Sequence, residues 1–306
     1  MKLTRLITLA VLCLGALTIF SGPSPLQKPP AKPGGTVALP EGVRVERDIA
    51  YVRGGHTRQK LDLYLPKAAG PLPLIINIHG GAFRMGSKAD GVPVEFLGLG
   101  YAVASIGYRL SGDAIWPAQI EDCKAAVRWL RANAVKYGLD PDRFAAWGAS
   151  AGGHLATMVG TAGGVKEFEV GENLGVSSRV QAVVDWYGPT DFLQMDLAHH
   201  RPDSPEARLL GCPIDACADQ VQAASPISYI DPGDPPFFIQ HGTADGTVPH
   251  GQSQLLHDAL RLRGVTSMFQ PIDGAGHGGG PFETPGNLAQ IDGFLDTFLK
   301  GDRGRD

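Results

Sequence analysis

The segment around Ser150 restricts the fold of this chain more than any other. Residues 144–147 form a short apolar run, Gly148–Gly152 reads Gly-Ala-Ser-Ala-Gly, and residues 150–159 have a helical composition. A strand that passes directly into a helix needs small residues around the turn, because backbone segments approach each other closely there. The pattern predicts a serine at a sharp strand-to-helix turn, with its hydroxyl raised at the carboxyl end of a sheet.

Short apolar runs alternate with segments of helical periodicity over most of the chain. The other predicted strands are residues 60–65, 72–78, 102–106, 180–186, 237–241 and 266–271, and the other predicted helices are residues 119–137, 252–263 and 287–300. In residues 60–65, leucines alternate with Asp62 and Tyr64, which is typical of a half-buried strand. Buried strands separated by helices imply an α/β fold, with a mostly parallel sheet and helices on both faces.

The first 42 residues have the composition of an export leader and a linker. Lys2 and Arg5 precede Leu6–Phe20, fifteen residues without a charge, which fits a signal peptide and is short for a membrane span. Because no good cleavage pattern follows, residues 1–22 are interpreted as either a signal peptide or an uncleaved N-terminal anchor. Residues 23–42, rich in proline and glycine, predict an extended linker.

Residues 43–300 are predicted to form one catalytic domain. Two stretches, about 166–178 and 191–234, do not fit the alternation of strands and helices, and the longer one is rich in Pro, Asp and His. We expect them to be insertions above the sheet edge that form a small lid or cap over the site rather than a second domain.

Composition and short motifs exclude several classes of function. The 306 residues have a formal net charge of −4 and no basic run, so no nucleic-acid partner is expected. The sequence has no P-loop, dinucleotide fingerprint or CxxC motif, and His199 and His200 have no third ligand at metal-binding spacing. We therefore expect no metal and no cofactor.

Three cysteines lie beyond the leader. Cys212 and Cys217 are five residues apart in a loop-like stretch, and in an exported protein they are candidates for a small disulfide. Two unpaired thiols remain the alternative, because only geometry decides. Cys123, inside a predicted helix, is interpreted as a small buried apolar residue.

A serine hydroxyl needs a base, and the base needs an acid partner. His277 lies in a glycine-rich loop between the last predicted strand and the last helix, and Asp245 follows the strand at residues 237–241. Asp273 is a competitor for the acid, but it is only four residues from His277 on the same loop. The carboxyl ends of strands in α/β sheets favour Asp245, so the predicted catalytic residues are Ser150, Asp245 and His277.

The backbone amides of Gly81, Ala82 and Ala151 are the predicted oxyanion hole. The first two belong to His79-Gly-Gly-Ala-Phe, which follows a buried strand, and Ala151 follows the predicted nucleophile. Amides aimed at a developing negative oxygen stabilise the tetrahedral intermediate of acyl transfer.

Together, these motifs resemble those of a known family. His79-Gly-Gly-Ala-Phe and Gly148-Ala-Ser-Ala-Gly-Gly-His look like those of α/β-hydrolase esterases related to hormone-sensitive lipase, closest to the branch with bifunctional acetyl-xylan and feruloyl esterases. Residues 117–131, 225–229 and 241–249 also read as that family does, so the resemblance covers roughly residues 43–300. Ala82 departs from the glycine that many relatives have.

The resemblance implies the α/β-hydrolase fold and an exported serine carboxylesterase. Its substrates would be short-chain esters, acetyl or feruloyl esters of plant polysaccharide among them, cleaved through an acyl-enzyme. The expected partner is a small ester or an acylated polysaccharide; a membrane is expected only through an uncleaved anchor. The alternative is a peptidase or amidase, arylformamidases included, with the same three residues.

Overall fold

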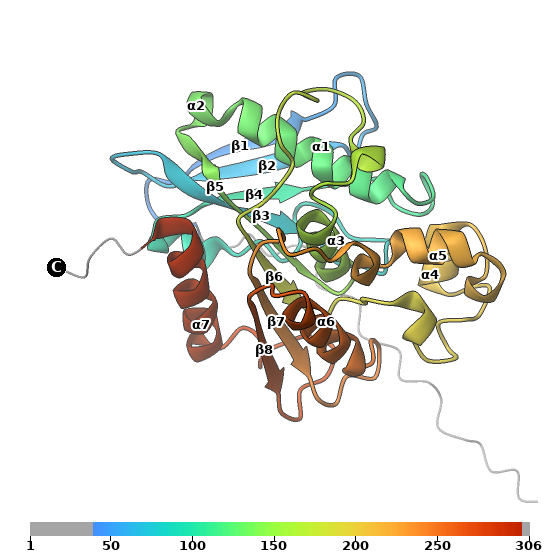
Figure 1. Cartoon of the computed structure of the whole chain (residues 1–306). Helices are drawn as coiled ribbons and strands as arrows, with labels where there is room; N and C mark the ends of the chain where they lie inside the picture. The colour runs from blue at the N-terminus through green and yellow to red at the C-terminus, as the bar shows by residue number, and fades with distance from the viewer. Residues whose placement is uncertain (1–38, 302–306) are drawn as a thin grey trace, which may run out of the picture. The chain divides into compact units, whose positions relative to one another are not determined.

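The computed structural model describes residues 39–301 and centres on an eight-stranded sheet (Figure 1). The strand order is β1-β2-β4-β3-β5-β6-β7-β8. The strands are β1 (Arg44–Ala50), β2 (Lys60–Leu65), β3 (Leu72–Ile78), β4 (Ala102–Ile106), β5 (Leu139–Ala149), β6 (Ala182–Trp186), β7 (Phe237–Gly242) and β8 (Ser267–Ile272).

The sheet is parallel from β4 to β8 and antiparallel only at one edge, where β2 pairs with β1 and β4. The parallel strands all end at the same edge of the sheet. The loops that follow β3, β5, β7 and β8 carry the predicted site residues, so the topology alone brings these loops together.

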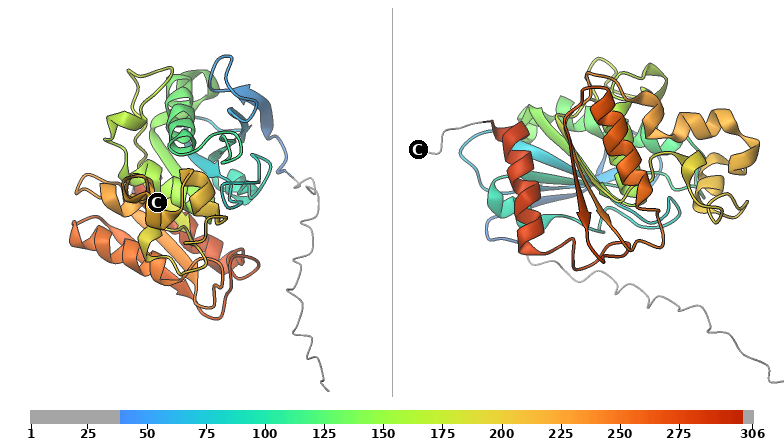
Figure 2. Two further views of the ribbon diagram at one scale, coloured as in Figure 1. Left: turned by 90° about the vertical axis from the view of Figure 1, so that its right-hand side faces the viewer. Right: turned by 60° about the horizontal axis from the view of Figure 1, so that its bottom comes forward.

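Helices cover both faces of the sheet. The helices are α1 (Ala118–Ala132), α2 (Ala134–Tyr137), α3 (Ala151–Thr161), α4 (Pro205–Leu210), α5 (Ala218–Ala224), α6 (Gly251–Leu262) and α7 (Pro285–Leu295). Apolar residues of α1, α3 and α6 belong to one core, and those of α7 and the 3₁₀ helix η1 (Val94–Leu99) belong to the other. Figure 2 shows α6 and α7 on opposite sides of β7 and β8. The prediction of a mostly parallel sheet covered on both faces is confirmed.

The prediction that residues 60–65 form a half-buried strand is wrong, because β2 is buried on both faces. Tyr64 packs into the core beneath η1. Asp62 is 1% exposed, and its carboxylate lies 2.6 Å from Lys88 Nζ and 3.2 Å from Arg47 Nη1. Long side chains from outside the strand thus neutralise a charge that the alternation had placed in solvent.

Two helices and the first strand also differ from expectation. The helix expected at residues 119–137 ends at Ala132, and α2 follows after Asn133, whose side-chain amide donates to the Trp129 carbonyl at 2.8 Å. The closing helix continues beyond α7 as one π-helical turn, η6 (Asp296–Lys300). Strand β1 was not predicted, because its side chains are mostly exposed or half-buried and lack a clear alternation.

The two stretches that interrupt the alternation pack against different helices. In residues 166–178, the Glu169 carboxylate pairs with Lys124 at 2.9 Å and with Arg128, both on α1. Residues 191–234 contain α4, α5 and the disulfide between Cys212 and Cys217, with Cα atoms 6.2 Å apart. Cys123 is a buried free thiol, as expected.

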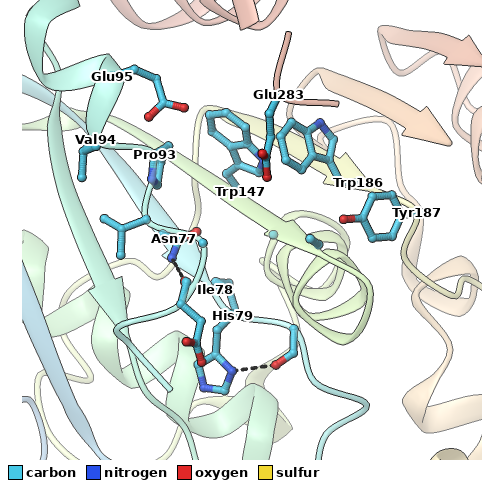
Figure 3. Close-up of a pocket in the computed structure, with 16 residues that line it drawn as sticks. Asn77, Ile78, His79, Pro93, Val94, Glu95, Trp147, Trp186, Tyr187 and Glu283 are labelled. Atoms are coloured by element: carbon cyan, nitrogen blue, oxygen red, sulfur yellow. Dashed lines mark hydrogen bonds between the residues drawn. The ribbon is translucent and has the colours of Figure 1, made fainter. Parts of the chain in front are cut away.

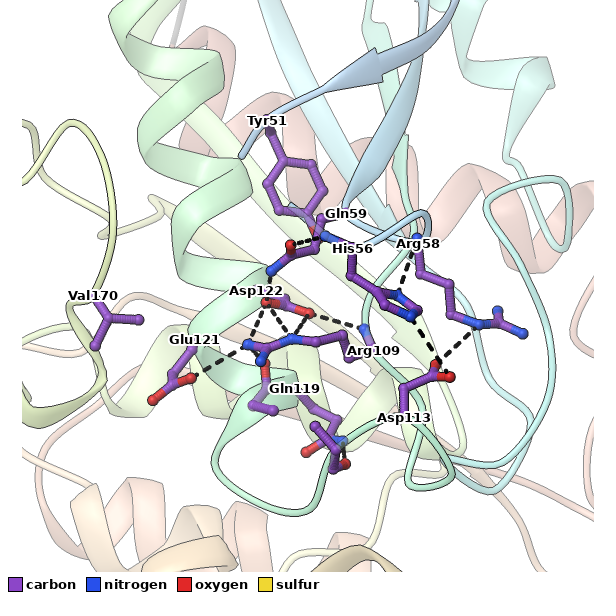
Figure 4. Close-up of polar contacts among 12 residues, drawn as sticks. Tyr51, His56, Arg58, Gln59, Arg109, Asp113, Gln119, Glu121, Asp122 and Val170 are labelled. Carbon is purple, nitrogen blue, oxygen red and sulfur yellow. Dashed lines mark hydrogen bonds and ion pairs between the residues drawn. The ribbon is translucent and has the colours of Figure 1, made fainter. Parts of the chain in front are cut away.

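A buried carboxylate fixes the junction between β4 and α1. Asp122 accepts hydrogen bonds from the Arg109 amide at 2.8 Å, from Arg109 Nη2 at 2.7 Å and from Gln59 Nε2 at 2.6 Å (Figure 4). A buried ion pair is stable when hydrogen bonds satisfy it in this way. The contacts hold the chain that follows β4 in place, including Tyr108, which supports the loop after β3.

Candidate active site

Ser150 sits at the turn between β5 and α3. Its backbone has φ 57° and ψ −123°, a conformation that costs a non-glycine residue about 1–3 kcal/mol and is typical of functional sites. The Ser150 amide donates to the Trp186 carbonyl on β6 at 2.8 Å, which ties the turn to the sheet. At Gly152, a Cβ would lie 2.0 Å from the Ile78 carbonyl oxygen. The close approach of β3 therefore requires a glycine at position 152.

The structure brings the three predicted catalytic side chains together. Ser150 Oγ lies 2.9 Å from His277 Nε2, and His277 Nδ1 lies 2.7 Å from Asp245 Oδ2. An ionised carboxylate only accepts, so His277 Nδ1 carries the proton and donates it to Asp245. The Nε2 atom is then free to accept the hydrogen bond of the Ser150 hydroxyl. The arrangement can take a proton from that hydroxyl as it attacks.

Backbone amides and a second imidazole fix Asp245. Its side chain is 0% exposed, and its Oδ1 accepts from the amides of Thr247 at 2.7 Å and Val248 at 3.0 Å. Its Oδ2 also lies 3.1 Å from Nε2 of the buried His241. Burial alone would raise the pKa of Asp245, but the hydrogen bonds from His241, His277 and Thr247 outweigh it and hold that pKa well below its usual range. The carboxylate therefore stays ionised beside His277.

His241 was missed at the level of sequence, although it lies only four residues before Asp245. Its Nε2 faces two acceptors, Asp245 Oδ2 and the Val248 carbonyl at 3.0 Å, so Nε2 is the protonated nitrogen. Its Nδ1 accepts from the Ser253 hydroxyl at 2.7 Å. The spacing of four residues, from the end of β7 into the loop that follows it, gave no sign that both side chains point to the same place.

Asp273 and the histidine pair make no hydrogen bond to the three predicted catalytic side chains, although His199 Nε2 lies 2.9 Å from the carbonyl of Thr247, whose amide holds Asp245. Asp273 Oδ1 accepts from Thr243 Oγ1 at 3.2 Å and makes no contact with His277. His199 Nδ1 lies 3.0 Å from Glu206 Oε2, and His200 Nδ1 lies 2.7 Å from Asp215 Oδ1. Within residues 39–301, no group of three His, Cys, Asp or Glu side chains could hold a metal ion.

The loop after β3 presents Gly81 and Ala82, the two amide donors predicted for this side. Their φ angles are 114° and 55°, and the Gly81 carbonyl accepts from the amides of Arg84 and Met85, both at 3.0 Å. The amides of Gly81, Ala82 and Ala151 donate to no backbone carbonyl among the described residues. This geometry leaves the three amides available for an oxyanion, and their assignment stays a prediction.

His79 and Tyr108 support that loop from below. Their rings stack with centroids 4.3 Å apart, and the Tyr108 hydroxyl donates to the His79 carbonyl at 2.9 Å. Burial lowers the pKa of His79 to about 4, so its ring is neutral near pH 7. The motif histidine is therefore part of the frame of the loop and carries no charge into the site.

Tyr187 packs against the predicted base. Its ring lies 4.7 Å from that of His277 and 4.8 Å from that of Phe282, and its φ of 45° is rare for a bulky residue. Burial, with a smaller contribution from the charge of Glu283, raises the pKa of Tyr187, so the hydroxyl stays protonated. Sequence patterns gave no indication of this contact, because Tyr187 follows β6, whose end carries none of the predicted residues.

A pocket of about 340 Å³ opens beside the turn (Figure 3). Gly80, Ala149 and Tyr187 line it, together with the indoles of Trp147 and Trp186. None of its lining residues comes from residues 166–178 or 191–234.

The fold and the site together define the class of protein. A mostly parallel sheet with a serine at the turn after β5, a carboxylate after β7 and an imidazole after β8 is the α/β-hydrolase fold. Residues 61–260 match the BD-FAE family, and the chain belongs to that family. The resemblance found in the sequence is confirmed.

Curated relatives are named as esterases. The probable carboxylic ester hydrolase LipM of Mycobacterium tuberculosis is 34% identical over 249 residues, which cover 74% of this chain and 56% of LipM. The chain spans little more than half the length of the curated relatives it matches first.

Solved structures agree with this assignment. A truncated carbohydrate esterase from gut microbiota has a TM-score of 0.79 and 34% identity, over 86% of this chain and 99% of that one. The bifunctional GH43-CE protein of Bacteroides eggerthii also has a TM-score of 0.79, with 38% identity over 83% of this chain and 35% of its own. Within residues 39–301, no helix is long and apolar enough to cross a membrane.

Proposed function

We propose that this chain is an exported serine carboxylesterase that hydrolyses short-chain esters through an acyl-enzyme. The observation that carries the proposal is the hydrogen-bonded series from Ser150 Oγ through His277 to Asp245, at 2.9 Å and 2.7 Å. A nucleophile, a base and an orienting carboxylate within hydrogen-bond distance are what acyl transfer to serine needs.

In the acylation step, Ser150 Oγ bonds to the ester carbonyl carbon while its proton moves to His277 Nε2. The carbonyl oxygen becomes an oxyanion, and the amides of Gly81, Ala82 and Ala151 stabilise it. When the tetrahedral intermediate collapses, the bond from the carbonyl carbon to the alcohol oxygen breaks. His277 returns the proton to that oxygen, and the alcohol leaves.

Deacylation repeats these steps with water. His277 takes a proton from water, whose oxygen bonds to the acyl carbon, and the bond to Ser150 Oγ then breaks as Ser150 regains a proton. Throughout, Asp245 stabilises the imidazolium without itself taking the proton. The product acid leaves and the free serine is restored.

The proposed substrates are acetyl and feruloyl esters of plant polysaccharide. Two similar solved structures support a carbohydrate ester, since one is named a carbohydrate esterase and the other a GH43-CE bifunctional protein. The motifs at His79 and Ser150 resemble the acetyl-xylan and feruloyl esterase branch. The Cys212–Cys217 disulfide supports export, because disulfides persist in oxidising compartments.

The test is hydrolysis of an ester panel by the full-length chain and its Ser150→Ala variant. The panel holds p-nitrophenyl acetate, a p-nitrophenyl ester of a long fatty acid, acetylated xylan, methyl ferulate and an acetylated dipeptide amide. We expect serine-dependent release from acetylated xylan or methyl ferulate, and little from the long-chain ester or the peptide. Preferred cleavage of the peptide, or ester cleavage that survives Ser150→Ala, contradicts the proposal.

Export is tested separately by cell fractionation. We expect the full-length chain, expressed in a bacterium, to appear outside the cytoplasm with the Cys212–Cys217 bond formed. Recovery of all the protein in the cytoplasm contradicts export and leaves the esterase proposal standing.

A further inference from the structure

The pocket beside Ser150 begins at the neighbours of the proposed nucleophile. Ala149 precedes Ser150 in the chain, and Gly80 belongs to the loop that holds the proposed oxyanion donors. Tyr187, whose ring packs 4.7 Å from that of His277, borders the pocket as well. The cavity of about 340 Å³ is therefore placed to receive one of the two halves of an ester that reacts at Ser150.

Two indoles give the pocket a rigid aromatic wall. The rings of Trp147 and Trp186 are 5.1 Å apart at 82°, and Trp186 Nε1 donates to Gln240 Oε1 at 2.6 Å, which fixes the half-buried indole. The faces of aromatic rings bind the apolar face of another ring well. This wall therefore suits a ring that packs against one of the indoles.

The side chains of Asn77, Glu95 and Glu283 present acceptor oxygens to the pocket, whereas the protonated Tyr187 hydroxyl can also donate. Asn77 Nδ2 donates to Ser105 Oγ at 2.9 Å and to the Asp90 carbonyl at 3.1 Å, which leaves Oδ1 as the free atom of the amide. Glu95 and Glu283 are exposed at the rim, above Asn77 in Figure 3, and form no ion pair or side-chain hydrogen bond within residues 39–301.

The charged groups that line the pocket all have the same sign. Asp90, Glu95 and Glu283 are carboxylates, and no lysine or arginine lines the pocket. The Asp90 carboxylate accepts from the Ser87 amide at 2.8 Å, whereas the side chains of Glu95 and Glu283 have no hydrogen-bond or ion-pair partner among the described residues. His79 also lines the pocket, and its buried ring is neutral.

We propose that this pocket is a subsite for an uncharged ring that carries hydroxyl groups, and that Glu95 and Glu283 make it reject rings that carry a carboxylate. The proposal rests on the proposed esterase function and adds the selection of one half of the ester. The ring can be a sugar that forms the alcohol half of the ester or a hydroxylated aromatic acid that forms the acyl half. Both present hydroxyl donors around a flat or apolar face.

The sign of the selectivity follows from electrostatics. A hydroxyl that donates to a carboxylate forms a charge-assisted hydrogen bond, which is stronger than one between neutral groups. A ligand carboxylate in the same place has no donor for Glu95 or Glu283 and is repelled by both. Because the two side chains are exposed, water screens this repulsion, and we expect a preference of about tenfold for the neutral ring.

The experiment compares the full-length wild type, a Glu95→Gln/Glu283→Gln double variant and a Glu41→Gln control. Glu41 is exposed, lies outside the pocket and loses the same charge. One arm varies the alcohol, with acetylated methyl xyloside against acetylated methyl glucuronoside. The other varies the acid, with methyl 4-hydroxycinnamate against methyl 4-carboxycinnamate. p-Nitrophenyl acetate, which carries neither a hydroxyl nor a carboxylate, is the reference.

In the wild type and the control, we expect kcat/KM to be about tenfold higher for the neutral ring in one arm, because KM is lower for that ring. The double variant should reduce this preference to about twofold after each kcat/KM is divided by that for p-nitrophenyl acetate. The arm in which the preference appears identifies the half of the ester that occupies the pocket. An equal preference in the wild type and the double variant in both arms overturns the proposal, as does an equal loss on p-nitrophenyl acetate.

The two proposals fail in distinguishable ways. If p-nitrophenyl acetate hydrolysis depends on Ser150 but the double variant has the same ring preference as the wild type, the esterase proposal stands and the subsite proposal fails. If no ester is hydrolysed, the esterase proposal fails, and the subsite is tested by titrating the tryptophan fluorescence with methyl xyloside, methyl glucuronoside, 4-hydroxycinnamamide and 4-carboxycinnamamide. In that experiment, equal affinity for the neutral and the anionic member of both pairs overturns the subsite proposal.

Discussion

The Nε2 atom of His241 lies 3.1 Å from Asp245 Oδ2, the same carboxylate oxygen that His277 contacts at 2.7 Å. The acid of the proposed triad is therefore shared by two imidazoles, one buried and one facing the serine. The buried imidazole is itself held by the Ser253 hydroxyl on α6. We interpret His241 as a positioning residue that sets the orientation of Asp245.

Replacing His241 should lower kcat without changing KM. The His241→Ala variant loses a hydrogen bond to a charged group, and we expect kcat for p-nitrophenyl acetate to fall about tenfold or more. His241→Gln can still donate to Asp245 and should recover part of that loss. If His241 has only a structural role, the activity of both variants should fall only in proportion to the fraction of protein that thermal unfolding shows to be unfolded.

Asp245→Asn should reduce kcat/KM about a thousandfold, because a neutral amide at this place favours the wrong tautomer of His277. The matched control is Asp273→Asn, since Thr243 Oγ1 is the only hydrogen-bond partner of the Asp273 side chain in the described part of the chain. Steady-state kinetics on p-nitrophenyl acetate should show the control within about twofold of the wild type, as for a surface substitution. A larger loss in Asp273→Asn than in Asp245→Asn assigns the acid to Asp273 instead.

Two helical glycines should respond oppositely to alanine. At Gly152 a Cβ would lie 2.0 Å from the Ile78 carbonyl oxygen, whereas at Gly293 in α7 it meets nothing within 4 Å. We expect Gly152→Ala to lower the free energy of unfolding by about 2 kcal/mol or more. Gly293→Ala should raise it by about 0.5–1 kcal/mol, because alanine favours the helix. Urea denaturation of both variants measures the difference, and equal effects refute the close packing of β3 against the turn.

Stability should fall in acid because of two buried neutral histidines. Burial lowers the pKa of His154 and that of His79 to about 4. As the pH falls from about 6.5 to 4, the unfolded chain binds protons at these sites and the folded chain does not. The two histidines therefore contribute fully to the free energy of unfolding above pH 6.5. As the pH approaches 4, this contribution is lost, and the free energy of unfolding falls by up to about 3 kcal/mol for each residue.

Denaturation of the wild type and two variants across this pH range checks the assignment. His154→Gln keeps a donor for the Ala224 carbonyl, which His154 Nε2 contacts at 2.7 Å, and should lose less stability between pH 7 and 4.5 than the wild type. Gln290→Ala, at an exposed position and without a titratable group, should follow the wild type. Identical pH dependence of His154→Gln and the wild type contradicts the assignment.

Local patterns predicted the parts of the fold that depend on short-range physics. The buried strands at residues 72–78 and 102–106 match β3 and β4 residue for residue, because a continuous apolar run needs burial on both faces. Residues 60–65 were misjudged because Asp62 is neutralised by Lys88, 26 positions away, and sequence periodicity contains no such information.

The residues of the candidate site also fall into those that the sequence predicted and those that it missed. The sequence predicted Ser150, Asp245 and His277 because each follows a strand in an order that the α/β topology brings together. It missed His241 and Tyr187, whose contacts depend on side-chain directions at the ends of strands. It also missed the pocket, because the lining residues come from several separate segments of the chain.

The most direct test of the account is covalent capture of the nucleophile. We expect the full-length chain, treated with the organophosphate paraoxon, to gain one diethyl phosphoryl group, and peptide mass spectrometry to place it on Ser150. The Ser150→Ala variant should gain none, and His277→Ala should react far more slowly. A phosphoryl group on another residue of the wild type, or an equal gain in Ser150→Ala, would contradict the assignment of Ser150 as the nucleophile.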